Sequence, residues 1–159
     1  MRKRIIGSIK KSSSIPERDW LDLERLADVE VTSEAADFPV EAALLTGKGT
    51  GWRAEQPGPQ LIRLIFDKPQ KLKEIVLAFT ENEIERTQEF SLRWSADGGR
   101  TFREIVRQQW NFNPNGASRE IEEFRLELSG VTILELEIVP DISGSNALAS
   151  LDQLRLAGF

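Results

Sequence analysis

The chain has 159 residues, with 21 Lys or Arg against 26 Asp or Glu and a formal net charge of -5. This length predicts a single domain with its own core, and 40% hydrophobic with 30% charged residues is typical of a globular protein. The sequence has no Cys and no His, which excludes thiolate nucleophiles, thiolate zinc sites, Ser-His triads and imidazole general bases.

Charge and hydropathy also limit where the chain acts and what it binds. The acidic balance disfavours nucleic acid, because phosphate binding rewards basic patches. A basic cluster at residues 2–4 resembles the start of a signal peptide, but no apolar run of about 7–15 residues follows it. No stretch approaches the roughly 20 apolar residues of a membrane span. We therefore expect a cytoplasmic protein, in agreement with its lack of Cys.

The N-terminal part of the chain carries a helical pattern. Ser14 can cap a helix whose first turn contains Glu17. Trp20, Leu23 and either Leu26 or Ala27 then follow at helical spacing. We predict a short helix whose apolar stripe packs on the domain.

From Val29 onward the period of the pattern changes to two. Apolar and polar residues alternate, as in strands with one solvated face. The alternation breaks between Phe102 and Trp110, where Ile105 and Val106 are adjacent, and this predicts a β-bulge. The alternating runs are 62–66, 75–79, 90–94, 124–128, 134–138 and 154–156.

Turn-forming residues separate these runs at short intervals. The turn signals lie at 67–69, 97–99, 113–116, 129–130 and 142–146. Short strands spaced in this way predict an all-β antiparallel sandwich or barrel. We assign residues 29–159 to this domain and residues 1–28 to an N-terminal tail with the short helix packed on it.

Eight local strings occur in an order known from one family of domains. They lie at 31–34, 42–45, 50–54, 61–66, 72–79, 86–92, 95–98 and 149–156. Over roughly residues 29–158 the chain resembles the discoidin or coagulation-factor C-type domain. The resemblance implies a galactose-binding-like jelly-roll sandwich of about eight strands, similar to carbohydrate-binding modules. Members of the family bind sugars, phospholipid head groups or proteins through loops at one end.

Many members of that family also hold a structural calcium ion. Their usual pattern is Asp-Gly shortly before Thr-x-Trp, with a Glu near the last strand. Here Thr46-Gly47 stands in place of Asp-Gly, and Gln153 stands in place of the Glu. Calcium prefers anionic oxygen ligands, so the loss of two carboxylates disfavours it. We expect no metal and no other cofactor.

The loop at 80–87 corresponds by position to a ligand-binding loop of sugar-binding relatives. Sugar recognition needs planar polar groups that pair with neighbouring hydroxyls. Four residues of the loop, Glu81, Asn82, Glu85 and Arg86, offer such groups. The alternative is a solvated charged loop without a ligand.

Aromatic and amide side chains outside this loop complete the candidate site. Trp110 could cover the apolar face of a sugar ring, with Asn111 beside it, or it could cap the core. Arg53 is either a ligand residue or the partner of a carboxylate, and we favour pairing. Trp52 and Trp94 are expected to pack in the core, Trp94 because it shares the alternating face of its strand.

No catalytic constellation emerges from the pattern. A glycosidase needs two carboxyl groups across a cleft, whereas carboxylates such as Glu120 and Glu135 are expected on solvated strand faces. We predict a non-catalytic binding module for a carbohydrate or similar small polar ligand, bound by loops at one end of the sandwich. The alternative is an intracellular protein–protein interaction domain or an accessory domain of an enzyme complex. The oligomeric state stays open.

Overall fold

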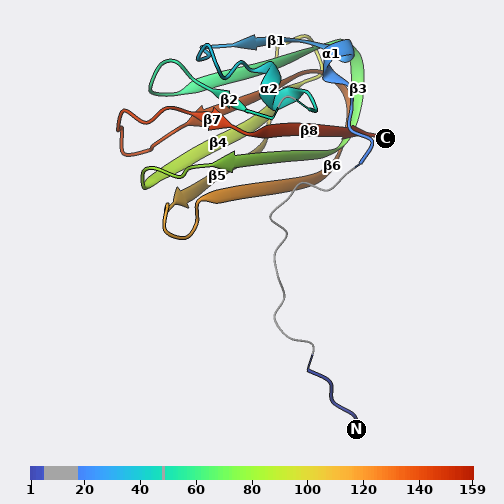
Figure 1. Cartoon of the computed structure of the whole chain (residues 1–159). Helices are drawn as coiled ribbons and strands as arrows, with labels where there is room; N and C mark the ends of the chain where they lie inside the picture. The colour runs from blue at the N-terminus through green and yellow to red at the C-terminus, as the bar shows by residue number, and fades with distance from the viewer. Residues whose placement is uncertain (6–17, 48) are drawn as a thin grey trace.

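The computed structural model describes residues 1–5, 18–47 and 49–159 (Figure 1). Short helices and long strands follow one another in the order α1 Leu23–Leu26, β1 Ala27–Val31, α2 Glu41–Leu44, β2 Trp52–Arg53, β3 Gln60–Thr80, β4 Arg86–Ser95, β5 Arg103–Phe112, β6 Arg119–Val139, β7 Ser150–Leu151 and β8 Gln153–Gly158. The prediction of an all-β domain with about eight strands is confirmed. No helix in the described ranges has the length and apolar character needed to cross a membrane.

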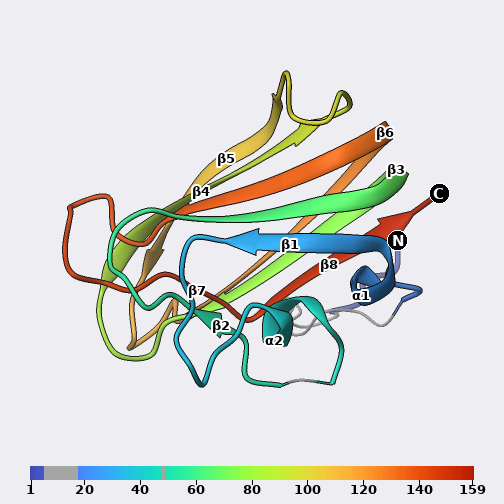
Figure 2. The ribbon, with the colours of Figure 1, turned by 90° about the horizontal axis from the view of Figure 1, so that it is seen from above.

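The strands form two antiparallel layers that share β3 and β6 (Figure 2). One layer contains β1, the first part of β3, the last part of β6, then β4 and β5. The other contains β8, the last part of β3 and the first part of β6. Strands β2 and β7 form a separate two-stranded ribbon. This arrangement is the antiparallel sandwich that the sequence predicts.

Two predicted turns are bends within single strands. The signal at 67–69 lies inside β3, and the signal at 129–130 lies inside β6. The pairing register of β3 with β6 shifts between Ile65 and Glu74, where Gln70 faces Val131. The prediction that these residues separate strands is wrong, because each strand stays paired while it passes from one layer to the other. Both bends therefore lie together at one end of the sandwich.

The core lies between the layers and is filled by the inward faces of the long strands. Phe79 of one layer packs against Phe90 of the other, with ring centres 5.4 Å apart. Leu77 and Leu92 are fully buried beside them. Each such side chain contributes roughly 1.5–3 kcal/mol of burial free energy. Trp52 is also fully buried and Trp94 packs on the core, as predicted.

The β4–β5 hairpin shows the bulge and the tight turn that the sequence predicts. Leu92 faces Val106 while Arg93 faces Glu104, so Ile105 is the extra residue of the bulge. In the turn, Gly98 has a φ of 74°, a conformation that glycine adopts without steric cost.

The N-terminal helix is shorter than predicted. Its expected start at residues 14–17 lies outside the described residues, and α1 is a single turn whose Leu23 enters the core. The preceding segment is fixed by an ion pair of Arg18 with buried Glu74 and by a bond from Leu21 N–H to the carbonyl of Leu156. Strand β1 starts at Ala27, two residues before the predicted domain boundary, because its backbone pairs with β3.

Two carboxylates expected on solvated faces are buried. Glu120 is 1% exposed and points into the sandwich, while Glu135 is 0% exposed on the outer face of β6. Arg63 and Arg93 come from neighbouring strands and cover Glu135, donating from their Nε atoms at 2.7 Å and 2.5 Å. The prediction failed for Glu135 because long arginine side chains bury a residue that strand alternation places outside. It failed for Glu120 because this residue shares strand parity with Phe124 and Leu126, which pack on the core.

Candidate functional site

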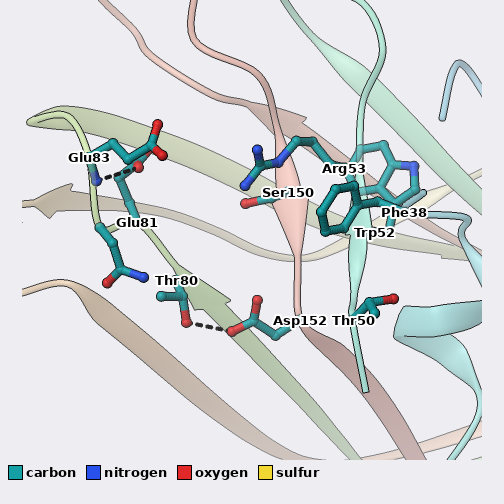
Figure 3. Close-up of a pocket in the computed structure, with 10 residues that line it drawn as sticks. Phe38, Thr50, Trp52, Arg53, Thr80, Glu81, Glu83, Ser150 and Asp152 are labelled. Carbon is teal, nitrogen blue, oxygen red and sulfur yellow. Dashed lines mark hydrogen bonds between the residues drawn. The ribbon is translucent and has the colours of Figure 1, made fainter. Parts of the chain in front are cut away.

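A hollow of about 210 Å³ opens at the end of the sandwich opposite the bends in β3 and β6 (Figure 3). It lies where β3 ends and where the β2–β7 ribbon begins. The lining side chains come from four segments that are far apart in the sequence, and they are Phe38, Thr50, Trp52, Arg53, Thr80, Glu81, Asn82, Glu83, Ser150 and Asp152.

The β2–β7 ribbon places Arg53 at the rim. Arg53 pairs with Ser150 in the ribbon, and its neighbour Trp52 anchors β2 by donating from Nε1 to the carbonyl of Ser33 at 3.0 Å. The N–H of Arg53 donates to the carbonyl of Phe38 at 3.2 Å. These bonds bring the Phe38 ring, the Arg53 guanidinium and the Ser150 hydroxyl together.

Gly51 permits the tight approach of β2 to β7, and its replacement gives a test of this geometry. It has a φ of 72°, and a Cβ atom there would lie 2.9 Å from the carbonyl oxygen of Leu151. Gly51→Ala should lower the free energy of unfolding by about 2–3 kcal/mol, since a left-handed residue costs roughly 1–2 kcal/mol and the clash adds to it.

The control for this prediction is Gly47→Ala. Gly47 also has a positive φ, of 80°, but a Cβ atom there would meet nothing within 4 Å. Denaturant unfolding of both variants separates the clash from the backbone strain. Equal losses would show that β2 and β7 do not approach as closely as described.

The guanidinium of Arg53 presents hydrogen-bond donors to the hollow. Its guanidinium carbon lies 5.0 Å from the centre of the Phe38 ring. In the part of the chain that the structure describes, no carboxylate lies within ion-pair distance of Arg53, so the expected pairing is wrong. Figure 3 shows the side chain extending across the hollow toward the loop that contains Glu81 and Glu83.

Glu81 forms the opposite wall and is held in position by Arg86. The Nε of Arg86 donates to Oε1 of Glu81 at 2.7 Å, and the N–H of Glu83 donates to Oε2 at 3.1 Å. Burial raises the pKa of Glu81, but the hydrogen bonds from Arg86 and Glu83 outweigh it, so the pKa lies below its usual value. Glu81 is therefore an ionised, oriented acceptor at neutral pH.

The floor of the hollow is a small polar cluster. The hydroxyl of Thr80 donates to Oδ2 of Asp152 at 2.5 Å. Arg119 donates from Nη1 to the same carboxylate oxygen and to the Thr80 hydroxyl, both at 3.2 Å. The cluster fixes the end of β3 against the start of β8.

The structure brings together only some of the residues that the sequence singled out. Arg53, Glu81 and Asn82 line the hollow. Arg86 lies beneath it, buried and bonded to Glu81 and to the carbonyl of Pro140.

The other candidates lie on β5 and directly before β4. Glu85 accepts a bond from Asn111 at 3.4 Å, and Asn111 also accepts a bond from Thr87, so this group is held on the outer face. Trp110 faces the other way, opposite Gln88, and its partly buried ring packs on the core. Its indole Nε1 is sheltered from solvent and has no hydrogen-bond partner among the described residues.

The sequence analysis did not single out four residues of the hollow: Phe38, Thr50, Ser150 and Asp152. Two of them belong to short loops without alternation, and Ser150 belongs to a two-residue strand. Only the pairing of β2 with β7 brings them together. The available signal was the family resemblance, whose strings at 50–54 and 149–156 contain Thr50, Ser150 and Asp152.

Comparison with known proteins identifies the fold. No protein-family model and no curated protein matches the chain. Among solved structures, the chain is similar to a CBM32 module from a family 31 glycoside hydrolase of Clostridium perfringens, with a TM-score of 0.62 and 20% identity over 88% of this chain and 95% of that one. It is also similar to a chitosan-binding module from a chitosanase/glucanase of Paenibacillus sp. IK-5, with a TM-score of 0.63 and 16% identity over 86% and 98% of the two chains.

A third similar structure is a larger enzyme. The chain matches part of a GH29 fucosidase of Ruminococcus gnavus, with a TM-score of 0.64 and 11% identity over 87% of this chain but 26% of that one. At these identities the likeness establishes the fold alone, an antiparallel β-sandwich that the chain shares with these structures.

Proposed function

We propose that this protein is a non-catalytic carbohydrate-binding module that holds one sugar residue in the hollow of Figure 3. The observation that carries the proposal is the position of Arg53. Its guanidinium has no carboxylate partner within the described residues and faces the acceptors Glu81 and Asn82 across the hollow, with the Phe38 ring beside it.

The arrangement suits the chemistry of a sugar ring. A guanidinium presents several parallel donors and a carboxylate presents two acceptors, so each can pair with two neighbouring hydroxyls. Phe38 adds an apolar surface to the site. Pockets for drug-sized ligands have volumes of about 300–1,000 Å³. A hollow of about 210 Å³ therefore favours one ring at the end of a glycan over a long segment of chain.

The electrostatics favour binding over hydrolysis. A glycosidase acid needs a raised pKa so that it stays protonated until it donates its proton. The pKa of Glu81 is lowered instead, and Asp152 accepts bonds from Thr80 and Arg119. Glu81 is therefore held as an anion, which makes it a hydrogen-bond acceptor for hydroxyl groups.

Similar structures support this proposal and also the alternative, an accessory domain of an enzyme. Two similar structures are a CBM32 module and a chitosan-binding module of glycan-degrading enzymes. In the fucosidase, the matching part covers about a quarter of the enzyme chain. An accessory module that brings an enzyme to its glycan would use the same hollow, so both forms share one test.

Removal of the Arg53 guanidinium tests the proposal. On a broad glycan array the wild-type protein should bind one sugar family, and Arg53→Ala should weaken that binding about 10- to 100-fold, since a hydrogen bond to a charged group contributes about 1.5–3 kcal/mol. The variant should keep its unfolding temperature because Arg53 is exposed.

The matched control is Arg107→Ala, an exposed arginine on the outer face of β5. It should bind glycans as the wild type does. A blank array from folded wild-type protein, or equal loss of binding in both variants, would refute the hollow as a sugar site and favour the protein-interaction reading.

A further inference from the structure

A buried guanidinium connects the last strand to the end of α2. Arg155 lies in β8 and is 7% exposed. Its Nη1 donates to the carbonyl of Ala43 at 2.8 Å and to that of Leu154 at 2.9 Å, and its Nη2 donates to the carbonyl of Leu45 at 3.5 Å. In the described part of the chain, no carboxylate forms an ion pair with it.

The contacts of Arg155 with these carbonyls are electrostatically favourable. The last carbonyls of a helix have no partner inside the helix, and they attract a cation or a donor. Ala43 and Leu45 lie at the end of α2, and the guanidinium points at both carbonyl oxygens. Burial lowers the pKa of Arg155, so these bonds offset a desolvation cost.

The position of Arg155 coincides with the loop in which the family pattern implies calcium. Thr46-Gly47 follows Leu45 directly, and Gln153 lies two residues before Arg155. A hollow of about 490 Å³ is lined by Gly47, Gln153 and Arg155 together. Thr46 lines a second hollow together with Arg155, so the guanidinium lies beside both altered positions.

The oxygen atoms of this site do not fit a calcium ion. Calcium takes six to eight oxygen ligands and prefers carboxylates. Thr46 and Gln153 are neutral, and the carbonyls of Ala43 and Leu45 already accept bonds from a cation. The carboxylate of Asp152 also lines the hollow, but its Oδ2 accepts bonds from Thr80 and Arg119.

We propose that the guanidinium of Arg155 takes the place of the calcium ion that the family pattern implies for this loop. The positive charge that faces the carbonyls of Ala43 and Leu45 is then part of β8. Residues 45–47, at the end of α2, are then held in place without any metal, and the rim residue Thr50 lines both hollows.

Thermal unfolding of three proteins tests the proposal. The wild type should unfold at the same temperature with millimolar CaCl2 and with EDTA. Arg155→Met should reduce the folding equilibrium constant about 10-fold or more, because two buried carbonyls lose their donors. Arg25→Met, which alters an arginine with a 79% exposed side chain, is the control and should leave stability unchanged.

A gain-of-function variant makes the test sharper. Thr46→Asp, Gln153→Glu and Arg155→Met together restore the acidic pattern and remove the guanidinium. This triple variant should gain a calcium-dependent rise in unfolding temperature, because a ligand that binds only the folded state stabilises it. A calcium- or EDTA-dependent shift in the wild type would overturn the proposal, as would an unchanged stability of Arg155→Met.

A more conservative variant covers the case in which Arg155→Met does not fold. Arg155→Lys keeps the charge, but its single ammonium group lacks the fork that reaches two carbonyls. Its stability should fall between that of the wild type and that of a protein without the cation, and it should not respond to calcium. Full wild-type stability in this variant would contradict the bridging role of the guanidinium.

Discussion

Replacing Arg86 with methionine should lower the free energy of unfolding by about 3 kcal/mol, because the change removes one partner of a buried ion pair. Arg86 is 3% exposed. It donates from Nε to Glu81 and from Nη1 to the carbonyl of Pro140, both at 2.7 Å. Its guanidinium carbon also lies 4.8 Å from the Phe112 ring centre. Methionine fills similar space but donates no bond, and denaturant unfolding at neutral pH measures the loss.

Arg107→Met provides the matched control for this prediction. Arg107 is 52% exposed and pairs with Glu104 and Glu89 on the outer face. Exposed ion pairs contribute only about 0–1 kcal/mol. Equal losses of stability in the two variants would contradict a stabilising role for the buried Arg86–Glu81 pair.

The same pair predicts a pH dependence. The pKa of Glu81 is lowered in the folded state, despite burial, by hydrogen bonds that include that from Arg86. A lowered carboxyl pKa stabilises the folded state above the unfolded value of about 4.3, and this stabilisation is lost as pH falls through the folded-state pKa. The stability difference between wild type and Arg86→Met should therefore shrink as pH falls below about 4. A difference that stays constant down to acidic pH would contradict this.

Replacing Glu135 with alanine should cost about 2–3 kcal/mol of unfolding free energy, because two charged hydrogen bonds are lost. Glu135 is 0% exposed and joins Arg63 of β3 to Arg93 of β4 across β6. Arg63 also donates to Glu30 of β1 at 2.9 Å. The carboxylate thus completes a row of alternating charges across four strands, and its loss leaves two arginines without their shared partner.

Glu137→Ala is the control for the Glu135 prediction. Glu137 lies two residues along β6 on the same face, and it forms no ion pair within the described ranges. It should change stability by less than about 0.5 kcal/mol. The combined variant Arg63→Met, Glu135→Leu and Arg93→Met should recover most of the loss, since apolar groups can replace a buried ion triad. A combined loss as large as that of Glu135→Ala would show that packing, not charge, decides stability at this position.

The alternation of apolar and polar residues was enough to predict the sandwich, but not the bends within β3 and β6. Runs such as 90–94 and 154–156 became strands as expected, because alternating apolar faces need a second layer to cover them. The residues at 67–69 favour a turn by composition, yet β3 continues through them. Whether such residues end a strand or bend it depends on the partner strand, and no local pattern contains that information.

The same limit of local patterns applies to individual side chains. Arg86 shares strand parity with Gln88 and Phe90, which face the core, so its burial could have been read from alternation. Burial of Glu135 depends on arginines in two other strands, and the position of Phe38 depends on its bonds to β2. Contacts between distant segments of this kind are set by register, which a single sequence does not reveal.

The most direct measurement is an amide ¹H–¹⁵N correlation spectrum recorded during titration with a panel of monosaccharides. Weak binding is sufficient for this experiment, and it reports where the sugar binds. We expect one class of sugar to shift the signals of Arg53, Ser150 and residues 80–83, and Arg53→Ala to abolish these shifts. Shifts confined to the β4–β5 face around Glu85 and Asn111, or no shifts with any sugar, would contradict a sugar site in the hollow.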